Sequence, residues 1–276
     1  MARASNLALR LATAGVGVPV ILFLLYKSPP WGFFALTTPA SMMCAYELLS
    51  MTHSEDRIGR WFGALMTGVI ASLVYFGAGD LRVVFTTLIT IAIVGPLFVL
   101  IRLGDIRTAA LRAVALSFAP LYTGIPLTLL ALLRKAVPFE GSGYILLALG
   151  LAWTSDTGGY FAGRYFGKHK LYEAVSPKKT IEGSIGGLLA VMTWATIGHF
   201  TFLQGPPLVH LILLALVGGA LSQAGDLAES VFKRSMGVKD SGQLLPGHGG
   251  ILDRVDAVLL TAPVVFLYIL WFPRLS

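Results

Sequence analysis

Residues 207–226 read PLVHLILLALVGGALSQAGD, an apolar run that ends on a carboxylate. A run of about 20 mostly apolar residues can cross the ~30 Å hydrocarbon layer of a membrane as an α-helix. The chain contains about nine such runs, and it lacks the alternating pattern of a membrane β-barrel, so we expect each run to be a helix. The expected spans lie near residues 10–27, 31–49, 61–79, 83–102, 112–133, 143–163, 183–203, 207–226 and 254–273.

The composition agrees with an integral membrane protein. Hydrophobic residues make up 55% of the 276 residues and charged residues only 13%, and the mean hydropathy is +0.76. These values exclude an ordinary soluble globular domain. The single cysteine, Cys44, lies in an apolar run, which excludes a disulfide framework and a cysteine metal site. We therefore predict an all-α integral membrane protein, a polytopic bundle of transmembrane helices.

The distribution of charge predicts how the chain is oriented. A net charge of +7 would suit a nucleic-acid binder, but the lysines and arginines lie in short loops between the expected spans. With the N-terminus in the cytoplasm, most of the 21 basic residues fall on the inner side, as the positive-inside rule requires. The exceptions are Lys27, Arg82, Arg134, Lys135 and Arg274. We expect a cytoplasmic N-terminus and no nucleic-acid partner.

Charge is concentrated at the end of the run at 207–226 and just after it. If residues 218–234 are helical, four polar side chains stand at i, i+4, i+7 and i+11 and form one stripe along the helix. These are Ser222, Asp226, Glu229 and Lys233. A membrane helix would normally be apolar there, so the stripe indicates a functional site.

A possible metal site follows from the carboxylates on either side of a glycine-rich loop. The loop reads PGHGG at 246–250, and Asp253 and Asp256 then stand three residues apart where the last apolar run begins. Mg²⁺ commonly takes one or two carboxylates and completes its shell with phosphates and water. We expect Asp226 and Asp253 to be the metal ligands, in a metal-assisted phosphate site.

Other residues of the segment 222–256 suit phosphate and proton chemistry. Lys233 and Arg234 would supply positive charge to phosphate groups, with arginine able to grip two oxygens at once. The glycines would let backbone amides approach a polyphosphate closely. His248 and Asp256 could accept or relay a proton.

Asp156 lies inside the run at 143–163, where an ionisable residue is costly and marks a functional site. The structural alternative is a pair with Arg164, two helical turns away. Glu47, near the end of the second run, is interpreted as a carboxylate that reaches out to the membrane interface.

The segment SPKKTIEG at 176–183 precedes the seventh expected span. Proline favours an extended Ser176, and Thr180 is expected to cap a helix that begins near Ile181. Lys178 and Lys179 beside that helix N-terminus suit phosphate oxygens, because the backbone donors add to their charge. Lysines that merely set the topology are an equal alternative.

These motifs resemble the signature of the CDP-diacylglycerol synthases, also called phosphatidate cytidylyltransferases. The likeness rests on SVFKR at 230–234, KDSG at 239–242 and PGHGGILDRVD at 246–256. It extends upstream through SDTGGY at 155–160 and SPKKTIEG at 176–183, with Gly159 where alanine is expected. The N-terminal half is similar only in hydropathy.

The resemblance implies that CTP and phosphatidate react to give CDP-diacylglycerol and pyrophosphate, with magnesium required and a second cation possible. It implies a multi-pass protein of a bacterial inner membrane, a cytoplasmic active site and a homodimer. The implied metal ligands are Asp226 and Asp253, and the implied phosphate ligands are Lys233, Arg234, Lys178 and Lys179. Residues implied for positioning or ligation are Asp156, Ser176, Glu182, Ser222, His248, Arg254 and Asp256.

Two rival functions stay open. A membrane transporter would also hold carboxylates among glycine-rich helices, although these charges lie at the cytoplasmic ends of the spans and not at the midplane. A CDP-alcohol phosphotransferase also uses aspartates on membrane helices. We expect residues 1–140 to form a transmembrane scaffold of about five helices, and residues 141–276 a catalytic region of about four helices with cytoplasmic polar loops.

Overall fold

The computed structural model describes residues 15–138, 140–242 and 249–272. Its contacts divide the chain into two compact units. Unit 1 comprises Met1–Ala131 and Asp240–Arg254, and unit 2 comprises Leu132–Lys239 and Val255–Ser276. The described residues 240–242 and 249–254 of the C-terminal signature therefore belong to the same unit as the N-terminal helices, which the sequence did not indicate. The functional division at residue 140 stays a prediction.

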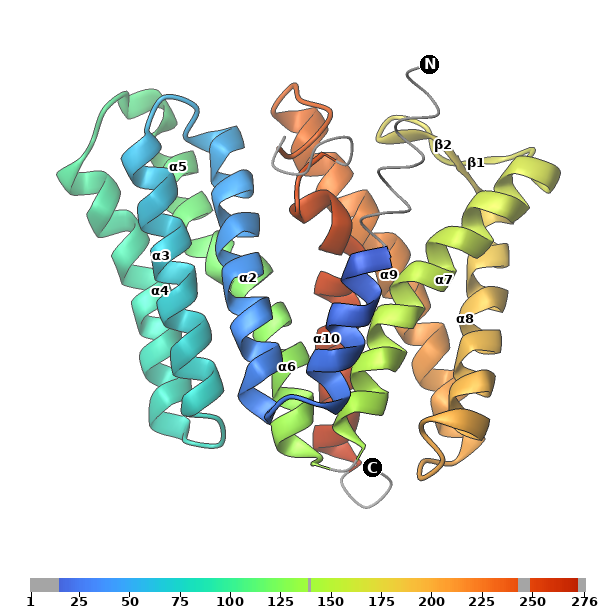
Figure 1. The fold of residues 1–276 in the computed structure, drawn as a ribbon. Helices are drawn as coiled ribbons and strands as arrows, with labels where there is room; N and C mark the ends of the chain where they lie inside the picture. The colour runs from blue at the N-terminus through green and yellow to red at the C-terminus, as the bar shows by residue number, and fades with distance from the viewer. Residues whose placement is uncertain (1–14, 139, 243–248, 273–276) are drawn as a thin grey trace. The chain divides into compact units, whose positions relative to one another are not determined.

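Unit 1 is helical in its described part (Figure 1). Its helices after the apolar helix Gly15–Tyr26 are α2 (Pro30–Thr52), α3 (Arg57–Phe76), α4 (Leu81–Ile101), α5 (Ile106–Ala119), the π-helical turn η1 (Pro120–Gly124) and the start of α6 (Ile125–Ala136). Three of them begin at an aspartate whose carboxylate accepts a hydrogen bond from a first-turn amide, as at Asp56 and Gly59. The hydroxyl of Thr123 lies 2.9 Å from the Ala119 carbonyl and 3.2 Å from the Ser41 carbonyl, so η1 contacts α2.

Unit 2 contains the rest of α6, then α7 (Gly141–Phe166), a β-hairpin, α8 (Ile181–Thr201), α9 (Leu208–Ser235) and most of α10 (Leu252–Trp271). The hairpin strands β1 (Lys170–Tyr172) and β2 (Ser176–Thr180) pair antiparallel and join α7 to α8 at one end of the unit (Figure 1). Thr180 caps α8 as expected, since its hydroxyl accepts a hydrogen bond from the Gly183 amide at 3.1 Å. The short hairpin is an addition to the all-α fold that we expected.

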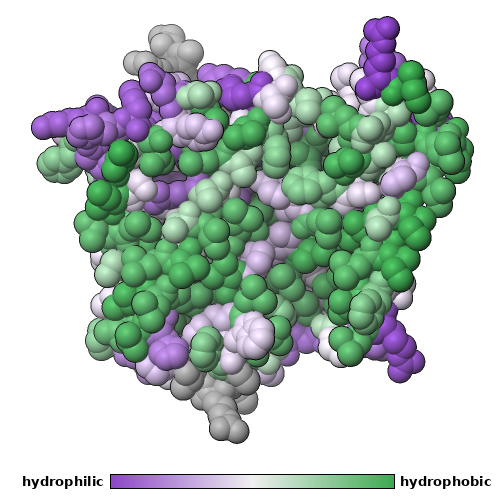
Figure 2. Space-filling model, turned by 180° about the vertical axis from the view of Figure 1, so that it is seen from behind, coloured by the Kyte–Doolittle hydropathy of each residue, from purple (hydrophilic) through white to green (hydrophobic). Residues whose placement is uncertain are grey.

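The helices carry the apolar surface that a bilayer requires. Six described segments are long and apolar enough to span a membrane: Arg57–Phe76, Leu81–Ile101, Ile106–Ala136, Ile181–Thr201, Leu208–Ser235 and Leu252–Trp271. On the face that Figure 2 shows, hydrophobic side chains cover most of the middle, and the most hydrophilic ones lie toward the upper and lower edges. The all-α membrane class is thus supported, whereas the number of about nine spans is not confirmed. Residues 31–49 and 143–163 are helical, in α2 and α7, but do not belong to these six segments.

Candidate active site

A cavity of about 420 Å³ lies in unit 2, where the end of α7, the hairpin, the start of α8 and the middle of α9 meet. Its walls combine glycines with acidic, basic and amide side chains. The lining residues are Ser155, Asp156, Gly159, Tyr160, Gly163, Arg164, Leu171, Lys178, Lys179, Thr180, Gly183, Ser184, Gln223 and Asp226. Four predicted site residues, Asp156, Lys178, Lys179 and Asp226, therefore share one cavity.

An ion pair crosses this cavity. The Lys179 ammonium lies 2.7 Å from a carboxylate oxygen of Asp226, and both side chains are partly exposed. Asp156 is close enough to both groups to be repelled by Asp226 and attracted by Lys179. Asp256, on α10, is repelled by Asp226 and Asp156 as well. The unit thus gathers several carboxylates around a lysine, an arrangement that a bound cation would stabilise.

A second ion pair, between Lys233 and Glu229, lies on the polar stripe of α9. The ammonium is 2.9 Å from the Glu229 carboxylate, and the two residues are 9% and 0% exposed. Glu229 also hydrogen-bonds Asp256. Residues 218–234 are helical as expected, and Ser222 is buried on the same helix. The positive charge of Lys233 is therefore balanced within the protein, which sequence reasoning did not anticipate.

The hairpin is held to α8 by Glu182. Its carboxylate accepts hydrogen bonds from the Lys168 amide at 3.1 Å and the His169 amide at 3.2 Å, and contacts the His169 ring at 2.6 Å. These contacts fix the start of the hairpin, so the structure gives Glu182 a supporting task. Its predicted role in substrate binding stays a prediction.

The remaining predicted residues are more scattered. Ser176 lies in β2, opposite Tyr172. Arg234 donates to the Val238 carbonyl at 3.2 Å, and Arg254 is exposed. His248 lies outside the described residues.

Ser184 and Gln223 are among the polar residues of the cavity that sequence reasoning did not include in the site. The Ser184 hydroxyl donates to the Gln223 side-chain oxygen, and the Gln223 amide donates to the Ser184 carbonyl at 3.0 Å. Gln223 neighbours the polar stripe in sequence, so a search of the positions next to the stripe would have found this residue.

The alternative pairing of Asp156 with Arg164 is not what the structure shows, because Arg164 donates to the Tyr160 hydroxyl at 2.9 Å.

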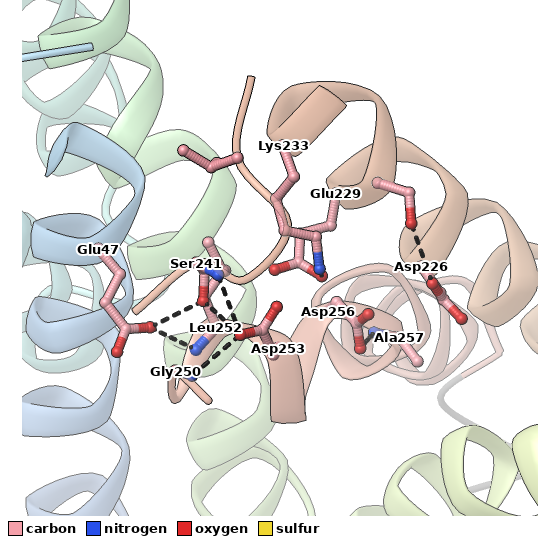
Figure 3. A network of polar contacts seen from close by, with 12 residues as sticks. Glu47, Asp226, Glu229, Lys233, Ser241, Gly250, Leu252, Asp253, Asp256 and Ala257 are labelled. Carbon is pink, nitrogen blue, oxygen red and sulfur yellow. Dashed lines mark hydrogen bonds and ion pairs between the residues drawn. The ribbon is translucent and has the colours of Figure 1, made fainter. Parts of the chain in front are cut away.

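The position of Glu47, in unit 1, corrects the interpretation of this residue that we made from the sequence. It is only 4% exposed and does not reach out to the membrane interface. Figure 3 shows its carboxylate directed toward Ser241 and the start of α10. Asp253 accepts hydrogen bonds from the Ser241 and Gly250 amides at 3.1 and 2.9 Å. An ionisable residue in an apolar run was the signal that should have marked Glu47.

The donor set suits a hard divalent cation. Within the described ranges, no three His, Cys, Asp or Glu side chains are placed to hold a metal ion by themselves. Magnesium seldom needs such a cage, because it keeps several waters and takes its other ligands from substrate phosphates. Carboxylates at Asp226 and Asp253 fit that use. Asp253 belongs to unit 1 and Asp226 to unit 2, so their shared ion stays a prediction.

The helices and the cavity define an integral membrane protein whose polar site combines carboxylates with lysines. The chain belongs to the cytidylyltransferase family, whose family model matches residues 8–272.

Similar curated proteins bear the name phosphatidate cytidylyltransferase. One from Staphylococcus haemolyticus is 46% identical over 126 residues, and one from Bacillus subtilis is 45% identical over 130 residues. One from Haemophilus influenzae is 47% identical over 139 residues. These matches cover 46%, 47% and 49% of this chain, respectively, and 48% of each relative. The chain thus spans about half the length of the curated relatives it matches.

Proposed function

We propose that this protein is a magnesium-dependent phosphatidate cytidylyltransferase, which converts CTP and phosphatidate into CDP-diacylglycerol and pyrophosphate in phospholipid synthesis. The observation that carries the proposal is the cavity of unit 2, which brings Lys178, Lys179 and Arg164 together with Asp156 and Asp226. Family membership and the names of the relatives support the same reaction.

The cations of the cavity suit a substrate rich in phosphate. Lys179 is held by Asp226 at 2.7 Å, which fixes the ammonium in place before a substrate arrives. Lys178 and Arg164 lie in the same walls. A preorganised set of positive charges stabilises negative charge that builds up during phosphoryl transfer.

A lipid substrate is supported by the apolar residues around the cavity. Tyr160 lines it and is 58% exposed, and Phe161 and Tyr165 on the same helix are exposed as well. Aromatic side chains of this kind gather at the boundary between lipid and water. Phosphatidate could therefore keep its acyl chains in the bilayer while its phosphate enters the cavity.

The reaction needs no nucleophile from the protein. A phosphate oxygen of phosphatidate, already anionic at neutral pH, forms a bond to the α-phosphorus of CTP. The bond between that phosphorus and the oxygen that bridges to the β-phosphorus breaks, and pyrophosphate leaves with the electron pair. Magnesium, held by Asp226 and Asp253, would neutralise charge on the phosphates. The protein's own residues align the two substrates, which can account for much of the rate.

The direct test is to incubate the purified protein with phosphatidate, magnesium and each nucleoside triphosphate in turn. We expect pyrophosphate to be released with CTP alone and CDP-diacylglycerol to form in equal amount. No release with any nucleotide, together with solute flux into vesicles that contain the protein, would favour a transporter. Conversion of CDP-diacylglycerol with an alcohol would favour a CDP-alcohol phosphotransferase.

Two substitutions test the cavity. Asp226→Asn should nearly abolish turnover, and Lys179→Ala should lower kcat/KM roughly 10²-fold, because each removes a fixed charge from the phosphates or their cation. Lys168→Ala is the matched control. This substitution removes the same charge, but Lys168 is exposed and does not line the cavity. Equal loss in the control, or full activity in Asp226→Asn at saturating magnesium, would contradict these roles.

A further inference from the structure

Glu47 places a buried carboxylate at the N-terminus of α10, more than 200 residues further along the chain. Its carboxylate accepts hydrogen bonds from the Ile251 amide at 3.0 Å and the Leu252 amide at 2.8 Å. These are among the first amides of a helix, which have no partner within the helix itself. A carboxylate at this end also interacts favourably with the helix dipole. Glu47 thus caps α10 from another helix, α2.

Ser241 links this cap to Asp253 (Figure 3). Its hydroxyl lies 2.9 Å from Asp253 and 3.3 Å from Glu47, and its amide donates to Asp253 at 3.1 Å. A serine hydroxyl has one proton to donate, so the shorter contact with Asp253 is favoured. Asp253 also accepts from the Gly250 amide at 2.9 Å. Asp253 therefore bonds to both Ser241 and Gly250, while Glu47 bonds to the two amides that follow Gly250.

Glycines make this close approach possible. A side chain at Gly242 would place its first carbon 2.6 Å from the Glu47 carboxylate, and one at Gly250 would collide with both Glu47 and Ser241. Gly249 has φ of 78°, a conformation that residues with side chains rarely adopt. Gly242 and Gly250 are thus explained by the packing of Glu47, and Gly249 by its backbone conformation. They do not by themselves show a role in binding phosphate.

We propose that Glu47 is a positioning residue for the cytidylyltransferase reaction: by capping the first turn of α10 and packing beside the Ser241 hydroxyl, it fixes the orientation of the Asp253 carboxylate. Glu47 touches neither substrate in this role and acts through the first turn of α10. The catalytic part of the inference rests on the proposed function, whereas the clamp itself is a property of the fold.

Amide hydrogen exchange without substrate tests the clamp. We compare wild type with Glu47→Gln, which keeps the shape of the side chain but turns a hydrogen-bond donor toward the α10 amides. We expect exchange at residues 241 and 250–252 to rise roughly tenfold or more, while the amides of α3 exchange as before. Glu55→Gln is the matched control, because Glu55 is an exposed glutamate of the same unit. Unchanged exchange at 250–252 in Glu47→Gln would overturn the clamp.

Kinetics separates positioning from plain stabilisation. In Glu47→Gln we expect kcat to fall about tenfold or more, because small misplacements of reacting groups are costly, and KM for phosphatidate to stay within about twofold. If exchange rises but kcat does not change, Glu47 is structural only and the positioning role is overturned. If wild type itself releases no pyrophosphate, the proposed function fails, and the exchange result still decides the clamp.

A second variant keeps the inference testable if Glu47→Gln does not fold. Ser241→Ala removes the hydroxyl between the two carboxylates but leaves the Glu47 contacts with α10 intact. We expect this protein to fold, exchange at 251–252 to stay slow, and kcat to fall at least threefold, since Asp253 loses one of its orienting hydrogen bonds. Wild-type kcat in Ser241→Ala would overturn the positioning role.

Discussion

His53 lies between α2 and α3 with only 2% of its surface exposed. Its Nδ1 atom is 2.9 Å from the Thr52 hydroxyl. Burial, opposed by Asp56 and reinforced by Arg112 and Arg60, lowers the pKa of the imidazole to about 4. The folded protein thus resists protonation at this position more than the unfolded chain, whose histidine has a pKa of about 6.5.

The sign of this pKa shift predicts loss of stability in mild acid. The folded-state pKa lies below the unfolded value, so the neutral ring does not lower the free energy of unfolding above pH ~6.5. This free energy falls as the pH drops from ~6.5 to ~4, because the unfolded chain takes up the proton more readily. Between pH 7 and 5 the expected loss is about 2 kcal/mol. Thermal unfolding in detergent at the two pH values should show a larger drop for wild type than for His53→Gln. Equal drops would contradict the assignment.

The ion pair of Glu229 and Lys233 supports a second prediction at this scale. Removing one partner leaves a buried charge, so Glu229→Ala should destabilise the protein by about 3–5 kcal/mol. Replacing both with apolar residues, as in Glu229→Leu with Lys233→Met, should recover most of that loss. Thermal unfolding measures both effects, and a double variant less stable than Glu229→Ala would contradict the pairing.

Close packing of α7 on α8 depends on small side chains. Gly158 faces Ala190 and the Gly186 carbonyl, and Gly183 faces the Gly159 carbonyl. Membrane helices use such residues to bring their backbones together, since lipid offers no hydrophobic drive for helix association. This packing carries Asp156 on α7 to the cavity wall formed by the start of α8.

An exchange of two side chains tests this packing. A methyl group at Gly186 would collide with that of Ala162, so Gly186→Ala should destabilise the protein by about 1–3 kcal/mol. The combination Gly186→Ala with Ala162→Gly should restore much of the stability, because the helices again meet through one methyl group. The test compares the unfolding temperature of the single variant with that of the double variant. Equal stability of the single and double variants would count against direct contact.

For the whole molecule, the orientation in the membrane follows from the loops of each unit. In unit 1 the loops at 53–56 and 102–105 are linked by the 3.5 Å ion pair of Asp56 with Arg102, and the loop at 77–80 joins the other ends of α3 and α4. In unit 2 the hairpin joins α7 to α8, and residues 202–207 join the far end of α8 to α9. The positive-inside rule predicts that the basic ends face the cytoplasm.

Single cysteines in a Cys44→Ala background should report this orientation. We expect residues 55 and 173 to react with a membrane-impermeant maleimide only in inside-out vesicles, and residues 79 and 204 only in intact cells or right-side-out vesicles. Reaction of residues 55 and 173 from opposite sides would contradict the predicted topology. The homodimer implied by the family resemblance also stays a prediction, which light scattering of the detergent-solubilised protein tests.

The sequence by itself determined the membrane class, most of the helices, the Thr180 cap and the polar stripe of α9. These features depend on local periodicity and on apolar length, which are properties of consecutive residues. From the sequence, Lys179 and Asp226 could be recognised only as members of two separate motifs. Only the tertiary structure brought them within 2.7 Å.

The tertiary structure alone decided the partners of Glu47 and Ser184. Each bonds to a group far away in the sequence, which leaves no local pattern. The assignment of residues 240–254 to the N-terminal unit has the same origin. A buried carboxylate must find donors wherever the fold supplies them, and in this protein they are the amides that open α10.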